Sequence, residues 1–155
     1  MSVKVLFKLE EGAKAPSYES PGAAGMDIRA FYSFTCEGAI GPAYCMLRAG
    51  KTLIIPTGIY VQIPQGYEIQ VRSRSGLAAK NGIFVLNSPG TIDSDYRGEI
   101  KVILKNTSSE DFKISSGDRI AQLVVAPVVQ AELVNVDTLD ETERGVGGFG
   151  STGVA

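Results

Sequence analysis

Two carboxylates and a tyrosine stand in one short segment of this chain, TIDSDY at residues 91–96. Pro89-Gly90 precedes them and is a strong turn signal. The segment therefore connects the apolar run Ile83–Leu86 to the alternating strand pattern of Ile100–Leu104, and we expect a hairpin. A turn needs only small or polar residues. A tyrosine beside two aspartates indicates a turn that takes part in chemistry.

The chain contains no histidine, which limits the chemistry that it can perform. Ser-His-Asp triads, Cys-His pairs and histidine-containing zinc sites are excluded. Any general base must be Asp, Glu, Lys or Tyr, and a carboxylate of this turn could activate a water molecule. The D-x-D spacing of Asp93 and Asp95 is a weak metal signal. Mg²⁺, however, needs few direct protein ligands when it is bound through the phosphates of a ligand.

Three other stretches contain residues suited to an anionic ligand. Arg74, Ser75 and Gly76 lead into the only predicted helix, and backbone N–H groups at a helix start beside arginine favour anions. Asp27 lies between glycines and an apolar strand pattern, and Gln122 points opposite to Leu123 if that strand lies in the core. Each stretch also has a plain structural interpretation, either a capped helix with solvated arginines or a turn before a core strand.

The segment from Arg144 to Ala155 is rich in glycine, and its composition is typical of a disordered tail. Arg144, Phe149, Ser151 and Thr152 nevertheless combine a cation, an aromatic face and two hydroxyls in one short stretch. Together with unobstructed backbone N–H groups, these are the parts of a lid that orders around a nucleoside triphosphate.

Short strand patterns separated by Gly and Pro occupy most of the chain, which predicts an all-β sandwich, barrel or jelly roll. The strands are expected at Val3–Leu9, Met26–Phe31, Tyr44–Leu47, Leu53–Pro56, Ile59–Ile63, Tyr67–Val71, Ile83–Leu86, Ile100–Leu104, Phe112–Ile114, Ile120–Val125 and Glu132–Val136. A single short helix is expected at Ser75–Asn81, with Ser75 as its N-cap and Gly82 as its stop.

Length and composition indicate one globular domain. The chain has 155 residues, 44% of them hydrophobic and 21% charged, and a net charge of −2. This charge argues against a nucleic-acid polymer or an anionic membrane as the main partner. The first residues do not resemble a signal peptide, and Leu123–Gln130, the longest apolar run, is too short to span a bilayer. We expect Cys36 and Cys45 to be free thiols and the protein to be cytoplasmic.

Five stretches, taken in order, closely resemble the motifs of the trimeric dUTP diphosphatase (dUTPase) family. They are AGMDIRA at 24–30, RSGLA at 74–78, GTIDSDYRGEI at 90–100, GDRIAQL at 117–123 and RGVGGFGSTG at 144–153. Ser73 departs from the proline of many members, which affects the rigidity of the approach to Arg74. The resemblance implies a jelly-roll-like β domain over residues 1–143 and a flexible Gly-rich C-terminal lid over residues 144–155. It also implies a homotrimer in which three subunits build each active site.

The resemblance implies hydrolysis of dUTP to dUMP and diphosphate with Mg²⁺, which keeps uracil out of DNA and supplies dUMP for dTMP synthesis. Asp93 would be the base for the water that attacks the α-phosphorus, Tyr96 would leave no room for a 2′-hydroxyl, and Asp27 would hold the Mg²⁺ shell through water. The implied substrate-binding residues are Arg74, Ser75, Gly76, Asn87, Gly90, Thr91, Ile92, Tyr96, Gln122, Arg144, Phe149, Gly150, Ser151 and Thr152. Among them, Asn87 and Gly90–Ile92 would bind uracil, Phe149 would stack on it, and Arg144 would meet the γ-phosphate.

Two other functions remain open at this point. A dCTP deaminase of the same fold is one, although the IDSDY turn and the glycine-rich tail match the hydrolase pattern. A non-catalytic nucleotide sensor is the other, although a sensor has no need of the base Asp93. The roles of Asp95, Arg97 and Glu99 are not assigned beyond support of the hairpin, and Arg97 is a candidate for an ion pair with Asp95 or Asp118.

Overall fold

The computed structural model of this protein describes residues 2–32 and 44–148. Within these ranges the chain forms ten strands and one short helix. They are β1 (Leu6–Leu9), β2 (Met26–Arg29), β3 (Tyr44–Leu47), β4 (Thr52–Gln62), β5 (Tyr67–Arg72), α1 (Ser75–Asn81), β6 (Ile83–Val85), β7 (Gly90–Ile92), β8 (Glu99–Asn106), β9 (Phe112–Ser115) and β10 (Arg119–Pro127). In this part of the chain, no helix has the length and apolar character needed to cross a membrane.

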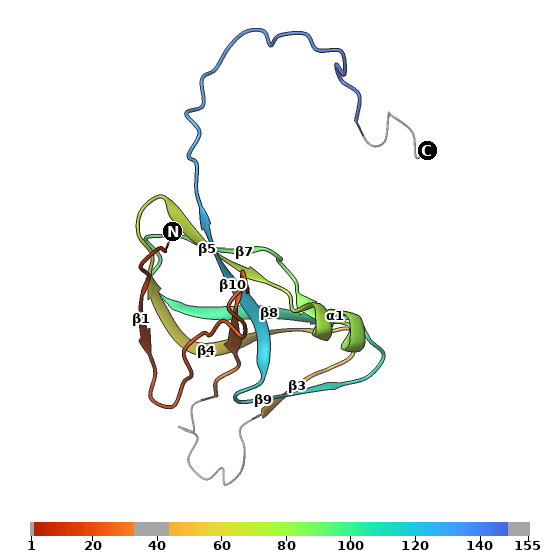
Figure 1. Cartoon of the computed structure of the whole chain (residues 1–155). Coiled ribbons are helices and arrows are strands. Elements are labelled where there is room, and N and C mark those ends of the chain that lie inside the picture. Colours follow the sequence, from red (N-terminus) through yellow and green to blue (C-terminus); the bar gives the residue numbers. More distant parts are fainter. Residues whose placement is uncertain (1, 33–43, 149–155) are drawn as a thin grey trace.

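The strands form two four-stranded antiparallel sheets and a small two-stranded one (Figure 1). The order of the first sheet is β1-β4-β8-β6, that of the second is β2-β10-β5-β7, and β3 pairs with β9. Neighbours in the sheets are often distant in sequence, as in a jelly roll. The all-β prediction with a single short helix is confirmed.

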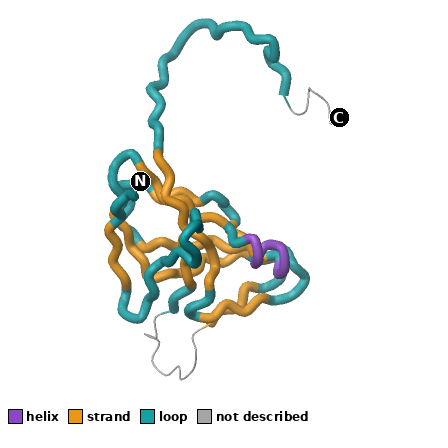
Figure 2. Tube along the Cα trace, viewed as in Figure 1, coloured by secondary structure: helices purple, strands orange, loops and turns teal. Residues whose placement is uncertain are grey.

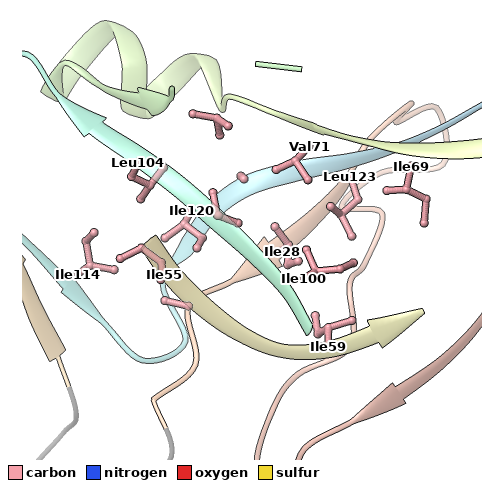
Figure 3. Close-up of a cluster of buried hydrophobic side chains, with 14 of the residues drawn as sticks. Ile28, Ile55, Ile59, Ile69, Val71, Ile100, Leu104, Ile114, Ile120 and Leu123 are labelled. Carbon is pink, nitrogen blue, oxygen red and sulfur yellow. The ribbon is translucent and has the colours of Figure 1, made fainter. Parts of the chain in front are cut away.

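Alternating apolar residues of both sheets fill the core between them (Figure 3). In β8, Ile100, Val102 and Leu104 are fully buried, whereas Lys101 is exposed on the outer face. Ile69 and Val71 of β5 meet them from the second sheet. The period-2 pattern of the sequence therefore determines which face of each strand is buried.

Two strands predicted at Leu53–Pro56 and Ile59–Ile63 are in fact one, the 11-residue β4. The Thr57-Gly58 step, which lies between the two predicted strands, is a bulge where the pairing with β8 shifts between Pro56 and Tyr60. Gly58 has a φ of +65°, and a Cβ there would lie 2.7 Å from the ring of Phe31. A bulge with glycine bends a strand without ending it, which explains the difference.

The strand predicted at Glu132–Val136 is wrong, since these residues have no strand conformation. β10 ends at Pro127, and residues 128–148 extend away from the body (Figures 1 and 2). Leu133 is 94% exposed and Val134 is 73% exposed. The sequence has the alternation of a strand, but a strand also requires a neighbour, and this segment has no strand neighbour among the described residues of its own chain.

Cys45 is a free thiol, as predicted, and Cys36 lies outside the described residues. The hydroxyl of Tyr32 lies 2.6 Å from Cys45 Sγ. Burial raises the pKa of Tyr32, and the hydrogen bond with Cys45 adds to this rise. The contact ties the end of the β2 segment to β3.

Candidate active site

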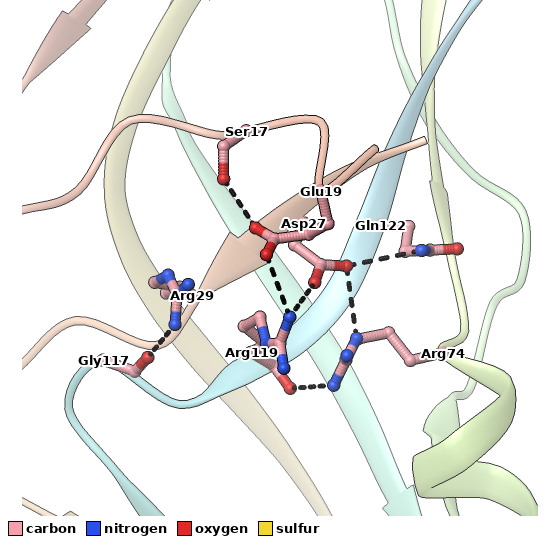
Figure 4. A network of polar contacts seen from close by, with 8 residues as sticks. All are labelled: Ser17, Glu19, Asp27, Arg29, Arg74, Gly117, Arg119 and Gln122. Carbon is pink, nitrogen blue, oxygen red and sulfur yellow. Dashed lines mark hydrogen bonds and ion pairs between the residues drawn. The ribbon is translucent and has the colours of Figure 1, made fainter. Parts of the chain in front are cut away.

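Asp27 is a buried carboxylate at the centre of a polar network (Figure 4). It lies on β2 and is 3% exposed. Its Oδ1 accepts hydrogen bonds from Arg74 Nε at 3.2 Å and from Gln122 Nε2 at 3.3 Å, and its Oδ2 accepts one from Arg119 Nη1 at 3.1 Å. A buried carboxylate of this kind holds its cationic partners in fixed positions.

The order of the second sheet explains why these residues meet. β10 lies between β2 and β5, and Gln122 is paired with Asp27 on one side and with Arg72 on the other. Arg74 follows two residues after the end of β5. Gln122 points away from the core while Leu123 is buried, as the sequence predicted.

Arg119 is a cationic member of the network that the sequence analysis did not identify. Strict alternation along β10 would place it on the same face as Ala121 and Leu123, in the core. An irregularity in the pairing with β2 between Arg119 and Ala121 reverses this, so Arg119 faces Asp27 instead. Its Nη1 also lies 3.2 Å from Glu19 Oε2. Only the polar character of Arg119 at a core position could have indicated its role.

Arg74 begins the helix segment and still has free donors. Its Nε donates a hydrogen bond to Asp27, and its Nη1 donates one to the carbonyl of Arg119 at 3.2 Å. A guanidinium has five N–H donors, so about three remain for another ligand, and the side chain is 25% exposed. The three donors lie beside the start of α1, where Ser75 and Gly76 are exposed.

The prediction of Ser75 as N-cap is wrong, because Arg74 is the N-cap residue and no side chain caps the helix. Ser75 is instead the first helical residue. A Cβ added at Gly76 would meet nothing within 4 Å, so open space lies above the helix start. Gly82 ends the helix in the left-handed conformation, as predicted.

Asn87 and β7 form a sheet edge beside β5, in which Asn87 and Thr91 are exposed and Gly90 is buried. Gly90 pairs with Val71, and Ile92 pairs with Ile69. A Cβ at Gly90 would lie 3.0 Å from the Nδ2 of Asn87, so the absence of a side chain lets the amide lie close to the backbone. The side-chain amide and the strand backbone together offer donors and acceptors to a flat polar ligand.

The turn after β7 is closed by several hydrogen bonds. The N–H of Tyr96 donates to the carbonyl of Asp93 at 3.2 Å. Arg97 Nη1 donates to the carbonyls of Ser94 at 2.7 Å and of Tyr96 at 2.9 Å. Within the described residues Arg97 forms no ion pair with Asp95 or Asp118, so the candidate pairing is wrong, and Arg97 stabilises the turn through backbone carbonyls.

Asp93 is exposed and lies in a surface cavity of about 770 Å³. The cavity is lined by the turn after β7, by the β4–β5 connection and by the start of the C-terminal segment: Ile63, Gln65, Gly66, Tyr67, Glu68, Asp93, Ser94, Asp95, Arg97, Val128 and Gln130. Arg74, Gln122 and Asp27 are not among these residues. The candidate base and the cationic network therefore occupy two separate places on one chain.

The direction of the strands explains this separation. β7 is antiparallel to β5, so Asp93 follows Ile92 toward Glu68, the end of β5 that is remote from Arg74. Asp93 is level with Glu68, and Arg74 comes six residues after Glu68. At about 3.3 Å per residue, Asp93 and Arg74 are roughly 20 Å apart along the sheet.

Arg144 is exposed in the extended segment, where its Nε donates to the carbonyl of Gly147 at 2.9 Å. The single chain does not bring it to the other site residues. Phe149, Gly150, Ser151 and Thr152 lie outside the described residues.

A metal held by three or more protein carboxylates or thiols does not fit the described part of the chain, which has no such cluster. Asp27 already accepts three hydrogen bonds, and a carboxylate has about four acceptor positions. One position on Oδ2 remains. A single free acceptor position on a carboxylate fits a Mg²⁺ ion that is bound mainly by ligand phosphates and water.

An exposed carboxylate, a polar strand edge and a set of arginine donors on an all-β scaffold are features expected of a protein that binds a phosphorylated ligand. Comparison with known families agrees with this class: the dUTPase family model matches residues 11–153. The chain belongs to the dUTPase family.

Curated relatives and solved structures agree with this assignment. The deoxyuridine 5'-triphosphate nucleotidohydrolase of Rhizobium etli (strain CIAT 652) is 56% identical over 93% of this chain and 88% of its own length. The protein of that name from Brucella melitensis biotype 2 is 52% identical over 97% of this chain and 92% of its own. A mutant dUTPase of Staphylococcus bacteriophage 80alpha, solved with dUpNHpp, has a TM-score of 0.82 at 26% identity and covers 97% of this chain and 99% of its own.

Proposed function

We propose that this protein hydrolyses dUTP to dUMP and diphosphate, with Asp93 activating the water that attacks the α-phosphorus. The turn at residues 93–96 is the observation that supports this most, since it presents an exposed carboxylate directly after the β7 edge. In a chain without histidine, a carboxylate is the natural base. The names of the relatives and the dUpNHpp bound to a structural neighbour point to the same substrate.

The phosphates bind to the cationic network in this proposal. Asp27 orients Arg74, whose remaining donors meet phosphate oxygens together with the exposed Ser75 and the N–H of Gly76. Gln122 lies in the same network, and Arg144 reaches the γ-phosphate from the C-terminal segment. Phosphoryl transfer depends mainly on positioning and charge neutralisation, which arginines supply.

Uracil binds to Asn87 and to the backbone of Gly90–Ile92. A fixed pattern of donors and acceptors rejects cytosine, because each buried polar group left unpaired costs about 1–3 kcal/mol. Tyr96, 44% exposed, lies against the deoxyribose and leaves no room for a 2′-hydroxyl. Phe149 stacks on uracil, and residues 144–155, including Gly150, Ser151 and Thr152, close over the bound nucleotide.

Mg²⁺ supplies charge neutralisation on the triphosphate when it is bound. The remaining acceptor position of Asp27 would hold one water of the Mg²⁺ shell. A structural Mg(II) ion is named for the phage phi11 dUTPase of S. aureus, a protein of the same fold at 23% identity.

The enzyme works as a homotrimer with shared sites in this proposal. Asp93 and Arg74 are too far apart along one sheet to act on one triphosphate, so another copy must supply one half. Exposed apolar residues also call for a partner, since Phe7 on the edge strand β1 is 56% exposed and Leu133 is 94% exposed. Sedimentation should show three copies, and a fully active monomer would refute the shared site.

Release of diphosphate from dUTP, dCTP, dTTP and UTP, with and without Mg²⁺, tests the proposed activity. Rapid release from dUTP alone, dependent on Mg²⁺, is expected. Deamination of dCTP would make the protein a deaminase instead. Nucleotide binding without any turnover would make it a sensor. The cytoplasmic location expected from the sequence stays a prediction.

A further inference from the structure

Tyr96 folds back over Gly98 and is anchored on the following residue. Its hydroxyl donates a hydrogen bond to the backbone carbonyl of Glu99 at 3.0 Å. A Cβ built at Gly98 would clash with the Tyr96 hydroxyl and would lie 2.5 Å from its Cζ and 3.0 Å from its Cε2. The ring therefore occupies the place that any side chain at position 98 would need.

Glu99 is itself held firmly by the bulge in β4. Its Oε1 accepts hydrogen bonds from the N–H of Thr57 at 3.0 Å and of Gly58 at 2.8 Å. Its Oε2 lies 3.5 Å from Lys101 Nζ, and the side chain is only 14% exposed. Backbone N–H groups in a bulge lack hydrogen-bond partners in the neighbouring strand. A carboxylate that accepts two of them fixes the bulge in β4 and its own residue, Glu99, relative to each other.

A tyrosine in an exposed turn would otherwise have free choice of rotamer. Here the ring is 44% exposed, yet its hydroxyl is tied to a carbonyl whose residue is bonded to the body of the first sheet. This combination provides an open aromatic surface with a fixed position, which a ring that excludes one small hydroxyl from a sugar requires.

We propose that Gly98 and Glu99 are positioning residues for sugar specificity: the bare backbone of Gly98 admits the Tyr96 ring, and the carbonyl of Glu99 fixes its hydroxyl. The inference deepens the proposed function and rests on it. Neither residue touches the substrate, and each acts through Tyr96. It assigns a role to Glu99, which the sequence analysis left as general support of the hairpin, and to its neighbour Gly98.

Gly98→Ala tests this directly. Ordinary contacts begin at 3.4 Å, so the ring must move by about 1 Å, and a misplacement of this size can cost about 10²-fold in a rate. The atoms in the way belong to an exposed side chain, not to backbone, so the ring should yield and the strand should not. We expect the ratio of kcat/KM for dUTP to that for UTP to fall at least about tenfold. Gly22→Ala is the matched control, because a Cβ there meets nothing within 4 Å.

Two further variants separate positioning from a general effect. Tyr96→Phe removes the bond to Glu99 and keeps the ring, so it should also lower the dUTP/UTP ratio. In a Tyr96→Ala background, adding Gly98→Ala should change the ratio no further, because no ring remains to collide. A dUTP/UTP ratio within twofold of wild type in both Gly98→Ala and Tyr96→Phe would overturn the proposal. So would a Gly98→Ala substitution that lowers this ratio as much in the Tyr96→Ala background as it does in the wild-type protein.

A crystal structure of Gly98→Ala distinguishes this proposal from the proposed activity. If wild type does not hydrolyse dUTP, the proposed activity is refuted. If the Tyr96 ring of Gly98→Ala has nevertheless left the Glu99 carbonyl, the positioning of Tyr96 by Gly98 is supported. A ring unmoved on Glu99 would refute the positioning whatever the activity.

Discussion

Replacing Asp27 by Asn should destabilise the protein measurably. The amide keeps the shape of the carboxylate but removes its charge and turns one oxygen into a donor. Either Arg74 or Arg119 then faces an N–H group at the place of its acceptor. An arginine that loses a buried partner keeps its charge, and this is the main origin of the cost.

The magnitude follows from burial. Removing one partner of a fully buried ion pair costs about 3–5 kcal/mol. Asp27 is 3% exposed, but Arg74 and Arg119 are 25% and 39% exposed, so water solvates the orphaned cations in part. We therefore expect a loss of about 2–3 kcal/mol in the free energy of unfolding. For a chain of this length, that lowers Tm by about 5–10 °C.

Thermal unfolding of wild type and variant at one protein concentration measures the effect, since Tm of an oligomer depends on concentration. Glu11→Gln is a control with the same change of charge at an exposed carboxylate in the loop after β1, and it should stay within about 0.5 kcal/mol. If Asp27→Asn melted as the control does, the network would contribute nothing to stability. The fixed position of Arg74 would then need another cause.

Two other predictions concern Tyr96 and the C-terminal segment, to which the proposed function assigns contacts with the substrate. Tyr96→Ala should admit UTP, because the ring that excludes the 2′-hydroxyl is gone, and the rate on UTP relative to dUTP measures this; a wild-type ratio would contradict it. Truncation after Glu143 should reduce diphosphate release severely while Tm stays near that of wild type. As far as the structure describes this segment, up to residue 148, the hydrogen bonds of Arg144 and its neighbours stay within it, as in the contact to Gly147, so we expect the body not to depend on them. Full activity of the truncated chain would show that residues 144–155 have no role in the reaction.

The sequence predicted the buried faces of the strands well, because alternation and burial have the same physical cause. In β8, the alternating residues Ile100, Val102 and Leu104 are all buried. It failed where backbone irregularity decides the outcome. The bulge in β4 joins two predicted strands into one, and the irregularity at Arg119 moves a charged residue from the core face to Asp27. Bulges depend on pairing between distant segments, which a local pattern does not contain.

The site shows the same division. Asp27, Gln122 and Arg74 could be picked from their residue types and neighbours, and the structure brings them together. Their distance from Asp93 could not be predicted, since it depends on which strand lies beside β7. Glu132–Val136 has the alternation of a strand but no strand partner in the described part of its own chain. An alternating pattern indicates that a segment can form a strand, but it does not identify the strand with which it pairs.

The role of Asp93 as the base is the central claim, and diphosphate release by Asp93→Asn tests it most directly. Asp95→Asn is the matched control, because it makes the same change two residues away in the same cavity. We expect Asp93→Asn to lose at least about 10²-fold in kcat while it still binds dUpNHpp, and Asp95→Asn to keep its turnover. Wild-type turnover by Asp93→Asn would contradict the account, and a loss confined to Asp95→Asn would show that the base is the other carboxylate.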